Sequence, residues 1–400
     1  METYIRKDLG MKAHRVVRTF EEGGMLVAEV ERCAHRKLRC GRCGLEAKGT
    51  KGRVEAPRHW RDLSMGGKWL VIEYWPYRVV CRACGVSTEG VPWSDRWSRL
   101  TRRLADAVAA MAKDRDWKAT AAHYALNWKT VLSAVKRAVE RGLAKRKLKP
   151  IRWIGIDEVS RKKGHHYLTL VYDLKRSELL WIGEGRTEET MKGFFAWLGK
   201  RRSKRIEAVC MDMWRPYLNA VREHAPQSVI AFDRFHLMRH LNDAVDEVRR
   251  ALVRKLRDRF RALIKGTRFV LLKNPWNLTP PQKQQLNALV RSNSPLSRAW
   301  YLKEDFRHFF DYVREAWAER HLRHWLAWAS RSRLEPFKRL ARRVRSHLAG
   351  ILAWTKLRVT NGAVEGMNNK VKLVSHRAFG FRNVEHYKMA IYHCCANLPV

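Results

Sequence analysis

Three acidic residues lie at positions where a divalent metal ion could be bound. Asp157 in IRWIGIDEVS and Asp212 in RIEAVCMDMW each end a short apolar run that predicts a buried strand. Glu365 follows much later in the chain, in the helix-like stretch TNGAVEGMNNKVK. Carboxylates are preferred ligands of hard divalent cations, and such sites catalyse phosphoryl transfer. The sequence therefore predicts a metal site that acts on a phosphate.

The charge of the chain indicates whose phosphate that would be. The sequence holds 82 Lys and Arg against 39 Asp and Glu, a formal net charge of +43. Such a surface attracts polyanions, with nucleic acid as the first candidate. A membrane partner would need a long apolar span or an amphipathic anchor, and the longest apolar candidate, Leu104 to Ala112, is too short. Because METYIRKDLG also lacks the apolar core of a signal peptide, we expect a cytoplasmic, nucleoid-associated protein with no membrane or small-molecule partner.

Four of the eight cysteines form two CxxC pairs. Cys40 and Cys43 make the first, Cys81 and Cys84 the second, and a glycine follows each pair. This doubled spacing is typical of a zinc ribbon, in which two knuckles hold one structural Zn²⁺ through four thiolates. The segment between the pairs is long enough to form extra strands. A redox pair or disulfides are the alternative, which a reducing compartment disfavours.

Other possible zinc ligands lie near the two knuckles. They are Cys33, His35 and His59. An isolated Cys or His beside a knuckle more often packs than ligates, so we expect the four knuckle cysteines to form the site.

The elements after Pro150 must position the first two acids. Apolar periodicity predicts strands over 152–159, 166–173, 178–183, 205–211 and 228–232, and helices over 187–200 and 216–224. A strand, a hairpin and then alternating helix and strand is the order of a ribonuclease-H-like core. In that architecture the first and fourth strands are parallel neighbours, which would bring Asp157 and Asp212 together. We therefore predict an α/β catalytic core.

The third acid lies in a predicted helix that begins near Asn361. At 100° per residue, Glu365 shares a polar arc with Asn361, Asn368, Asn369 and Lys372, while Val364, Met367, Val371 and Val374 form an apolar face. The apolar face would pack on the sheet, and the Asn and Lys side chains would bind DNA phosphates. Alternatively, Glu365 only favours the first helical turn through the helix dipole.

A helix-turn-helix is predicted between the cysteine-rich segment and the core. A short helix near Thr120 to Tyr124 would turn at Ala125-Leu126, and Asn127 would cap a third helix with Val131, Val135 and Val139 on one stripe. The residues off that stripe are candidates for major-groove contact: Trp128, Lys129, Thr130, Ser133, Lys136 and Arg137. An ordinary three-helix packing unit is the alternative, because the turn lacks the glycine often found there.

Several long blocks, in order, match a known family. They are the paired CxxC knuckles, IGIDEVSRKKGHHYLTLVYDL, CMDMWRPY, DRFHLMRHLNDAVDEVRR and TNGAVEGMNNKVKLVSHRAFGFRN. With these blocks the chain resembles, nearly end to end, the DDE transposases of the ISL-three family of bacterial insertion sequences. By position, the resemblance implies that Asp157, Asp212 and Glu365 are the catalytic acids. Asp233 in AFDRFHLMRH also follows a predicted strand, so it is a metal ligand, a helix cap or the partner of a neighbouring arginine in an ion pair.

The resemblance also implies a domain order. It comprises a zinc-ribbon domain (1–97), a helix-turn-helix (98–143), the first part of a ribonuclease-H-like domain (144–236), a basic helical insertion (237–347) and the final helices that carry the Glu (348–400). In the insertion, TPPQKQQL and SPLSRAWYLKEDFRHFF predict two helix starts.

The implied activity is DNA transposition. The enzyme would bind the terminal inverted repeats, cleave DNA with two Mg²⁺ (or Mn²⁺) ions per active site, and join the freed 3′ end to target DNA. Both ends must be held at once, so we expect a homodimer or larger assembly on double-stranded DNA. Two alternatives remain: a zinc-containing DNA-binding regulator without catalysis, and a structure-specific nuclease on the same fold.

Overall fold

The computed structural model describes residues 2–34, 37–162, 164, 166–255, 264–292, 294–357 and 362–399. The chain divides into two compact units, one of residues 1–146 with 398–400 and one of residues 147–397. Among helices in the described residues, none combines the length and apolar composition needed to cross a bilayer.

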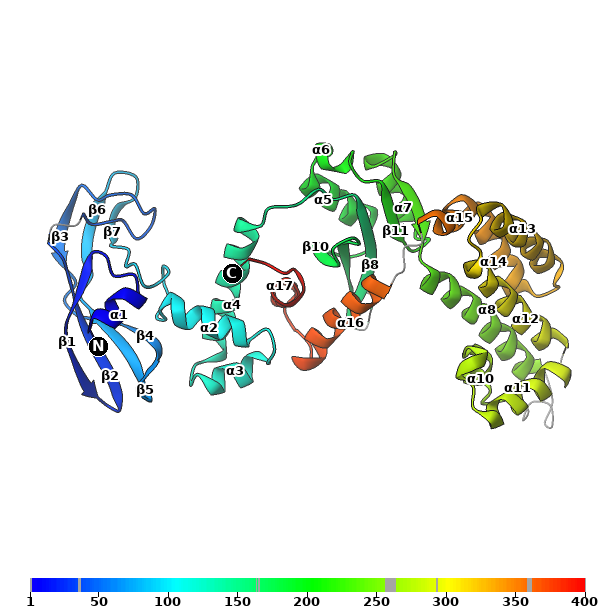
Figure 1. Ribbon diagram of the computed structural model, residues 1–400, viewed down its shortest axis with the longest axis horizontal. Coiled ribbons are helices and arrows are strands. Elements are labelled where there is room, and N and C mark those ends of the chain that lie inside the picture. The colour runs from blue at the N-terminus through cyan, green and yellow to red at the C-terminus, as the bar shows by residue number, and fades with distance from the viewer. Residues whose placement is uncertain are drawn as a thin grey trace. The chain divides into compact units, whose positions relative to one another are not determined.

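The first unit begins with two sheets whose strands are antiparallel except for the parallel pair of β2 and β5 (Figure 1). After α1 (Glu2–Asp8), one sheet has the order β1-β2-β5-β4 and the other the order β3-β6-β7. Their strands are β1 (His14–Glu22), β2 (Met25–Arg32), β3 (Gly49–Arg53), β4 (Arg58–Met65), β5 (Lys68–Tyr74), β6 (Tyr77–Cys81) and β7 (Gly85–Thr88). The extra strands predicted between the two cysteine pairs are thus confirmed. Trp60 and Trp93 are buried in the core, with ring centroids 5.6 Å apart.

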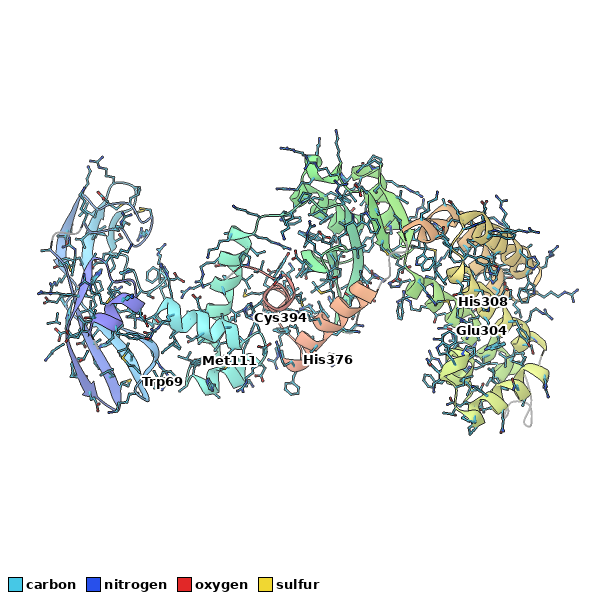
Figure 2. All side chains as sticks on the ribbon, viewed as in Figure 1. Trp69, Met111, Glu304, His308, His376 and Cys394 are labelled. Carbon is cyan, nitrogen blue, oxygen red and sulfur yellow. The ribbon has the colours of Figure 1, made fainter. Side chains whose placement is uncertain are left out.

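Three helices complete the first unit. They are α2 (Arg102–Met111), α3 (Trp117–His123) and α4 (Trp128–Lys145). As predicted, Asn127 caps α4 by accepting the Lys129 N–H at 2.9 Å. Ala125 turns the chain between α3 and α4 with φ of 45°, a conformation usually taken by glycine. Arg61 joins this turn to β4, because its guanidinium donates to the Tyr124 and Ala125 carbonyls. The same guanidinium lies 4.1 Å from the ring centroid of Trp69, which is labelled in Figure 2.

The second unit contains a five-stranded sheet with the order β10-β9-β8-β11-β12. Its strands are β8 (Trp153–Lys162), β9 (His166–Asp173), β10 (Glu178–Glu184), β11 (Ala208–Met211) and β12 (Val229–Phe232). The first three pair antiparallel, whereas β8, β11 and β12 run parallel, so the predicted neighbourhood of the first and fourth strands is confirmed.

The strand and helix bounds differ from the prediction at two points. Strand β8 continues to Lys162, so Asp157 lies within the strand and not near its end. The helix predicted through Lys200 is divided into α5 (Glu188–Leu198) and α6 (Lys200–Ser203), because Gly199 between them has φ of 82°. The next helix is α7 (Arg215–His224), close to its predicted span.

Helices from the end of the chain pack on this sheet. They are α15 (Leu348–Leu357) on β12, α16 (Gly362–Arg377) on β8 and α17 (Val384–Cys395) on β10. Helices α16 and α17, which carry His376 and Cys394 labelled in Figure 2, also pack together, and Arg377 donates to the Sγ of Cys394 at 3.6 Å. Asn361, where the helix was expected to begin, lies outside the described residues.

A helical region separates β12 from α15. Its described helices are α8 (Arg234–Lys255), α10 (Arg268–Leu272), α11 (Pro280–Ser292), α12 (Ser294–His308), α13 (Glu315–Arg331) and α14 (Glu335–Ser346). The starts of α11 and α12 match the two predicted helix starts. Its interior includes Phe306, Trp325 and Phe337, all fully buried and continuous with the core of the sheet.

Candidate active site and metal centre

The parallel pair β8 and β11 brings Asp157 and Asp212 to the same level of the sheet. Gly155 is the register partner of Cys210, and each acid follows two residues later. The backbone N–H of the next residue donates to each carboxylate, from Glu158 to Asp157 at 2.7 Å and from Met213 to Asp212 at 2.6 Å. One backbone N–H therefore holds each carboxylate in place. Both carboxylates also lie beside the side chain of His236.

The imidazole of His236 lies between the acids of this site. His236 Nε2 lies 3.5 Å from an oxygen of Asp157 and 3.5 Å from an oxygen of Asp233, and His236 Nδ1 lies 3.6 Å from an oxygen of Asp212. Burial works against charge on this ring, but the surrounding carboxylates outweigh burial and raise the pKa of His236. Three carboxylates from β8, β11 and the start of α8 thus surround one buried group.

Asp212 is held as a carboxylate. Burial alone would raise its pKa, but the hydrogen bond from His240, the charges of His236 and His240 and the Met213 N–H outweigh burial and lower the pKa of Asp212 to about 2. Arg239 adds a further cation 3.4 Å from this side chain. Asp212 is therefore ionised at neutral pH, as a ligand of a hard cation must be.

Asp233 has a different environment. It is buried, and its Oδ1 accepts the Phe235 N–H at 2.8 Å, so it caps the start of α8. Burial, only partly offset by His236 and this N–H, raises the pKa of Asp233 to about 6. The helix-capping alternative is observed, and its second oxygen still faces His236.

Helix α16 approaches β8 closely because Gly155 has no side chain. A Cβ at this position would lie 2.9 Å from Val364 Cγ2 of α16 and 2.7 Å from Leu174 Cδ2. One turn further, Asn368 donates from Nδ2 to Asp157 Oδ2 and accepts from the Tyr172 hydroxyl at 2.7 Å. Glu365 lies between Val364 and Asn368 in this helix, and its side chain lies outside the described part of the structure.

The predicted polar arc of α16 is divided. Asn369 and Lys372 are exposed, as expected of residues that bind phosphates, but Asn368 is buried beside Asp157. The spacing of 100° per residue placed Asn368 with the exposed residues. That spacing cannot show that Asn368 has the buried polar partners Asp157 and Tyr172.

Sequence reasoning did not identify His236, Arg239 or His240 as site residues. A signal was available: Asp233, His236 and His240 recur at helical spacing directly after a strand, and so share one helix face. These side chains reach Asp157 and Asp212 because α8 begins where β12 ends.

The chemistry of the donor set fits divalent cations. Asp157 and Asp212 are partly exposed carboxylates at the same level of neighbouring parallel strands, each held by a backbone N–H, and together with Asp233 they lie around His236. Oxygen donors at such a point are what Mg²⁺ or Mn²⁺ requires.

The four knuckle cysteines form a second, separate cluster in the first unit. The Sγ atoms of Cys40, Cys43, Cys81 and Cys84 all lie within 4.8 Å of one another, and these thiols are free. Tetrahedral Zn–S bonds of about 2.3 Å place sulfurs roughly 3.8 Å apart, so the cluster is compatible with structural zinc. His59 instead pairs with Glu73 at 2.8 Å, Cys33 is not in the cluster, and His35 lies outside the described residues.

The candidate DNA-contacting residues of α4 lie mostly on its exposed side. Trp128, Lys129, Ser133 and Lys136 are exposed, whereas the stripe of Val131, Val135 and Val139 is buried as predicted. Thr130 and Arg137 are half-buried, and Arg137 donates to the Arg96 carbonyl at 3.0 Å.

Comparisons with known proteins agree with this arrangement. Two family models match: one described as a transposase, over residues 154–391, and one described as the helix-turn-helix domain of transposase family ISL3, over residues 89–139. The transposase for insertion sequence element IS1001 of Bordetella parapertussis is 32% identical over 356 residues, which cover 88% of this chain and 87% of the relative. The transposase for insertion sequence element IS1557 of Mycobacterium tuberculosis is 32% identical over 388 residues, which cover 90% and 86%. The chain belongs to the ISL3 family of transposases.

Proposed function

We propose that this protein is an insertion-sequence transposase that binds the terminal inverted repeats of its element, cleaves the DNA there and joins the freed end to target DNA. The observation that carries the proposal is the placement of Asp157 in β8 and of Asp212 directly after β11, each two residues beyond the paired Gly155 and Cys210, with His236 between the two acids. Glu365 is the proposed third catalytic acid, because it lies in α16 between two residues that contact β8 or Asp157.

Family membership and the carboxylate donor set support a divalent-metal mechanism, with two Mg²⁺ or Mn²⁺ ions held by Asp157, Asp212 and Glu365. When bound, such ions activate the attacking oxygen and stabilise the departing one. Asp157 and Asp212 hold their positions through the N–H groups of Glu158 and Met213. In the first step a water oxygen bonds to phosphorus and the 3′ oxygen leaves with a proton. In the second, that 3′ hydroxyl releases its proton as its oxygen bonds to a target phosphorus, and the target's own 3′ oxygen leaves and takes up a proton.

The sheet order supports a ribonuclease-H-like core. A central strand with a hairpin on one side and two parallel strands on the other is the arrangement expected of that fold, here interrupted between β12 and α15 by the helical region. We propose the division 1–97, 98–143, 144–236, 237–347 and 348–400, in which the first domain is a zinc ribbon with one Zn²⁺ held by the four cysteines.

DNA is the proposed partner on three grounds. The helix-turn-helix family match covers α3 and most of α4, the net charge is +43, and Asn369 and Lys372 are exposed on the helix that carries Glu365. Because the two element ends must be held together, we propose a homodimer or larger assembly on double-stranded DNA in the bacterial cytoplasm.

The test uses purified protein, Mg²⁺ and a labelled duplex that carries the inverted repeat flanking the gene. Wild-type protein should nick the end and join it to a target plasmid. Asp157→Asn should abolish both products while DNA binding persists. Glu207→Gln is the matched control, because it makes the same chemical change to an exposed carboxylate beside β11, at the opposite end of the strand from Asp212.

The products separate the alternatives. Binding without nicking by wild-type protein would indicate a regulator, and nicking without joining would indicate a nuclease. Undiminished joining by a folded Asp157→Asn variant would refute the proposed mechanism.

A further inference from the structure

A groove in the first unit lies beside the cysteine cluster. Its volume is about 570 Å³, and it is lined by the first knuckle, by β6 and β7, and by the loop that leads to α2. The knuckle is fastened to this wall, since the Gly41 N–H donates to the Thr88 carbonyl at 3.0 Å and the Gly90 N–H to the Arg39 carbonyl at 2.9 Å. A Cβ on Gly41 would lie 2.6 Å from the Thr88 oxygen, so only glycine permits this close approach.

The lining of the groove is strongly basic. Six arginines contribute: Arg42, Arg58, Arg78, Arg96, Arg99 and Arg102. Only two acids oppose them. Glu89 is buried and accepts from the Tyr74 hydroxyl at 2.6 Å and the Tyr77 N–H at 2.7 Å, and Asp95 pairs with Arg102 at 2.8 Å and Arg141 at 3.0 Å.

Most of these arginines have no carboxylate partner. Within the described residues, no ion pair joins Arg42, Arg78, Arg96 or Arg99 to an acid, and all four are exposed. Burial, and after it the charge of Arg99, lowers the pKa of Arg58, so two cations share this wall without compensation. Like charges kept together are stabilised by a bound anion.

An aromatic ring projects next to these cations. Trp97 is 83% exposed and has φ of 62°, a conformation that residues with a side chain rarely adopt. The loop around it is nevertheless held firmly: the Ser98 N–H donates to the Asp95 carbonyl at 3.0 Å, Arg137 donates to the Arg96 carbonyl, and the Arg96 guanidinium covers the Trp97 ring at 5.1 Å. Strained backbone conformations cluster at ligand sites, which makes Trp97 the candidate contact for a ligand of this groove.

We propose that this groove binds a single strand of DNA, with the exposed arginines on its phosphates and Trp97 stacked on a base. A single strand fits better than a duplex, because base faces are available for stacking only where bases are unpaired. The groove is distinct from the exposed side of α4, which would hold duplex DNA. The inference rests on the proposed function only in that the protein acts on DNA.

The test measures binding of the full-length protein to a fluorescent 20-nucleotide single strand of mixed sequence and to the corresponding 20-base-pair duplex. Trp97→Gly removes the ring, and glycine accepts the positive φ without strain. This variant should bind the single strand about tenfold more weakly, with less than a twofold change for the duplex. Trp97→Tyr, which keeps a stacking ring, should stay within about threefold of wild type.

A matched pair of arginines tests the phosphate contacts. Arg42 and Arg82 are exposed and each lies between the two cysteines of its knuckle, but only Arg42 lines the groove. Arg42→Ala should weaken single-strand binding and reduce the slope of log affinity against log salt by about 0.7, whereas Arg82→Ala should change neither. Zinc content and circular dichroism verify that both variants fold.

Equal effects of Trp97→Gly on both probes, no effect on either, or equal behaviour of Arg42→Ala and Arg82→Ala would overturn the groove proposal. Those outcomes would leave the proposed function standing if the wild-type protein still cuts element-end DNA. Failure of the wild-type protein to bind either probe would instead remove both.

Discussion

We predict that Asn368 holds the carboxylate of Asp157 in its catalytic position through a hydrogen bond. Its side chain joins the Tyr172 hydroxyl to Asp157 inside the sheet–helix contact between β8 and α16. Asn368→Ala removes a neutral hydrogen bond worth about 1 kcal/mol and one to a charged group worth about 1.5–3 kcal/mol, and leaves the buried Tyr172 hydroxyl unpaired. These contributions are not additive, so we expect a loss of roughly 2–4 kcal/mol in the free energy of unfolding.

The effect on activity should be larger than the effect on stability suggests. A catalytic group displaced by about 1 Å can cost on the order of 100-fold in rate, and Asn368→Ala removes the side chain that holds Asp157 Oδ2. Tyr172→Phe is the matched control. It removes only the bond to Asn368 Oδ1 and keeps the one to Asp157, so it should cost about 1 kcal/mol and little activity.

The assay combines urea unfolding with the nicking rate on the element-end duplex, measured at a temperature where all three proteins are folded. Nicking by Asn368→Ala within threefold of wild type would refute the positioning role. So would an equal loss of activity in Tyr172→Phe, because that result would assign the effect to the hydroxyl.

Three further predictions concern the first unit. Cys40→Ser combined with Cys84→Ser should reduce bound zinc, measured by mass spectrometry, from one equivalent to none, whereas Cys33→Ser should retain it; full metal content in the double variant would contradict the cluster. Ala125→Gly should raise the free energy of unfolding by about 1 kcal/mol, because φ of 45° strains alanine but not glycine, and a decrease measured by urea unfolding would count against that turn. His14 lies between Tyr74 and Trp93, and burial, then Arg32, lowers its pKa to about 4, against 6.5 unfolded. Below pH 6.5 the unfolded chain protonates His14 and the folded chain does not, so the free energy of unfolding should be highest above pH 6.5 and fall by about 3 kcal/mol as the pH falls toward 4. His14→Phe should remove this dependence, and calorimetry across that range measures it.

Local structure was readable from the sequence. Strands β9 and β10, the Asn127 cap and the starts of α11 and α12 fall where residue pattern and capping chemistry predicted them. These features depend on residues close together in the chain, whose preferences act over a few positions. The grouping of the four cysteines was also predictable, because the CxxC spacing specifies each half of the cluster.

The sequence by itself thus determined the order of elements, the basic charge and the candidate acids Asp157, Asp212 and Glu365. Only the tertiary structure decided that Asp157 and Asp212 share one register level, that His236 lies between them, and that Asn368 turns inward to hold Asp157. It also decided that the first knuckle and the loop carrying Trp97 form one groove. The physical reason is the same in each case: these contacts join residues distant in the chain, and their geometry follows from strand pairing and close packing, which local preferences do not specify.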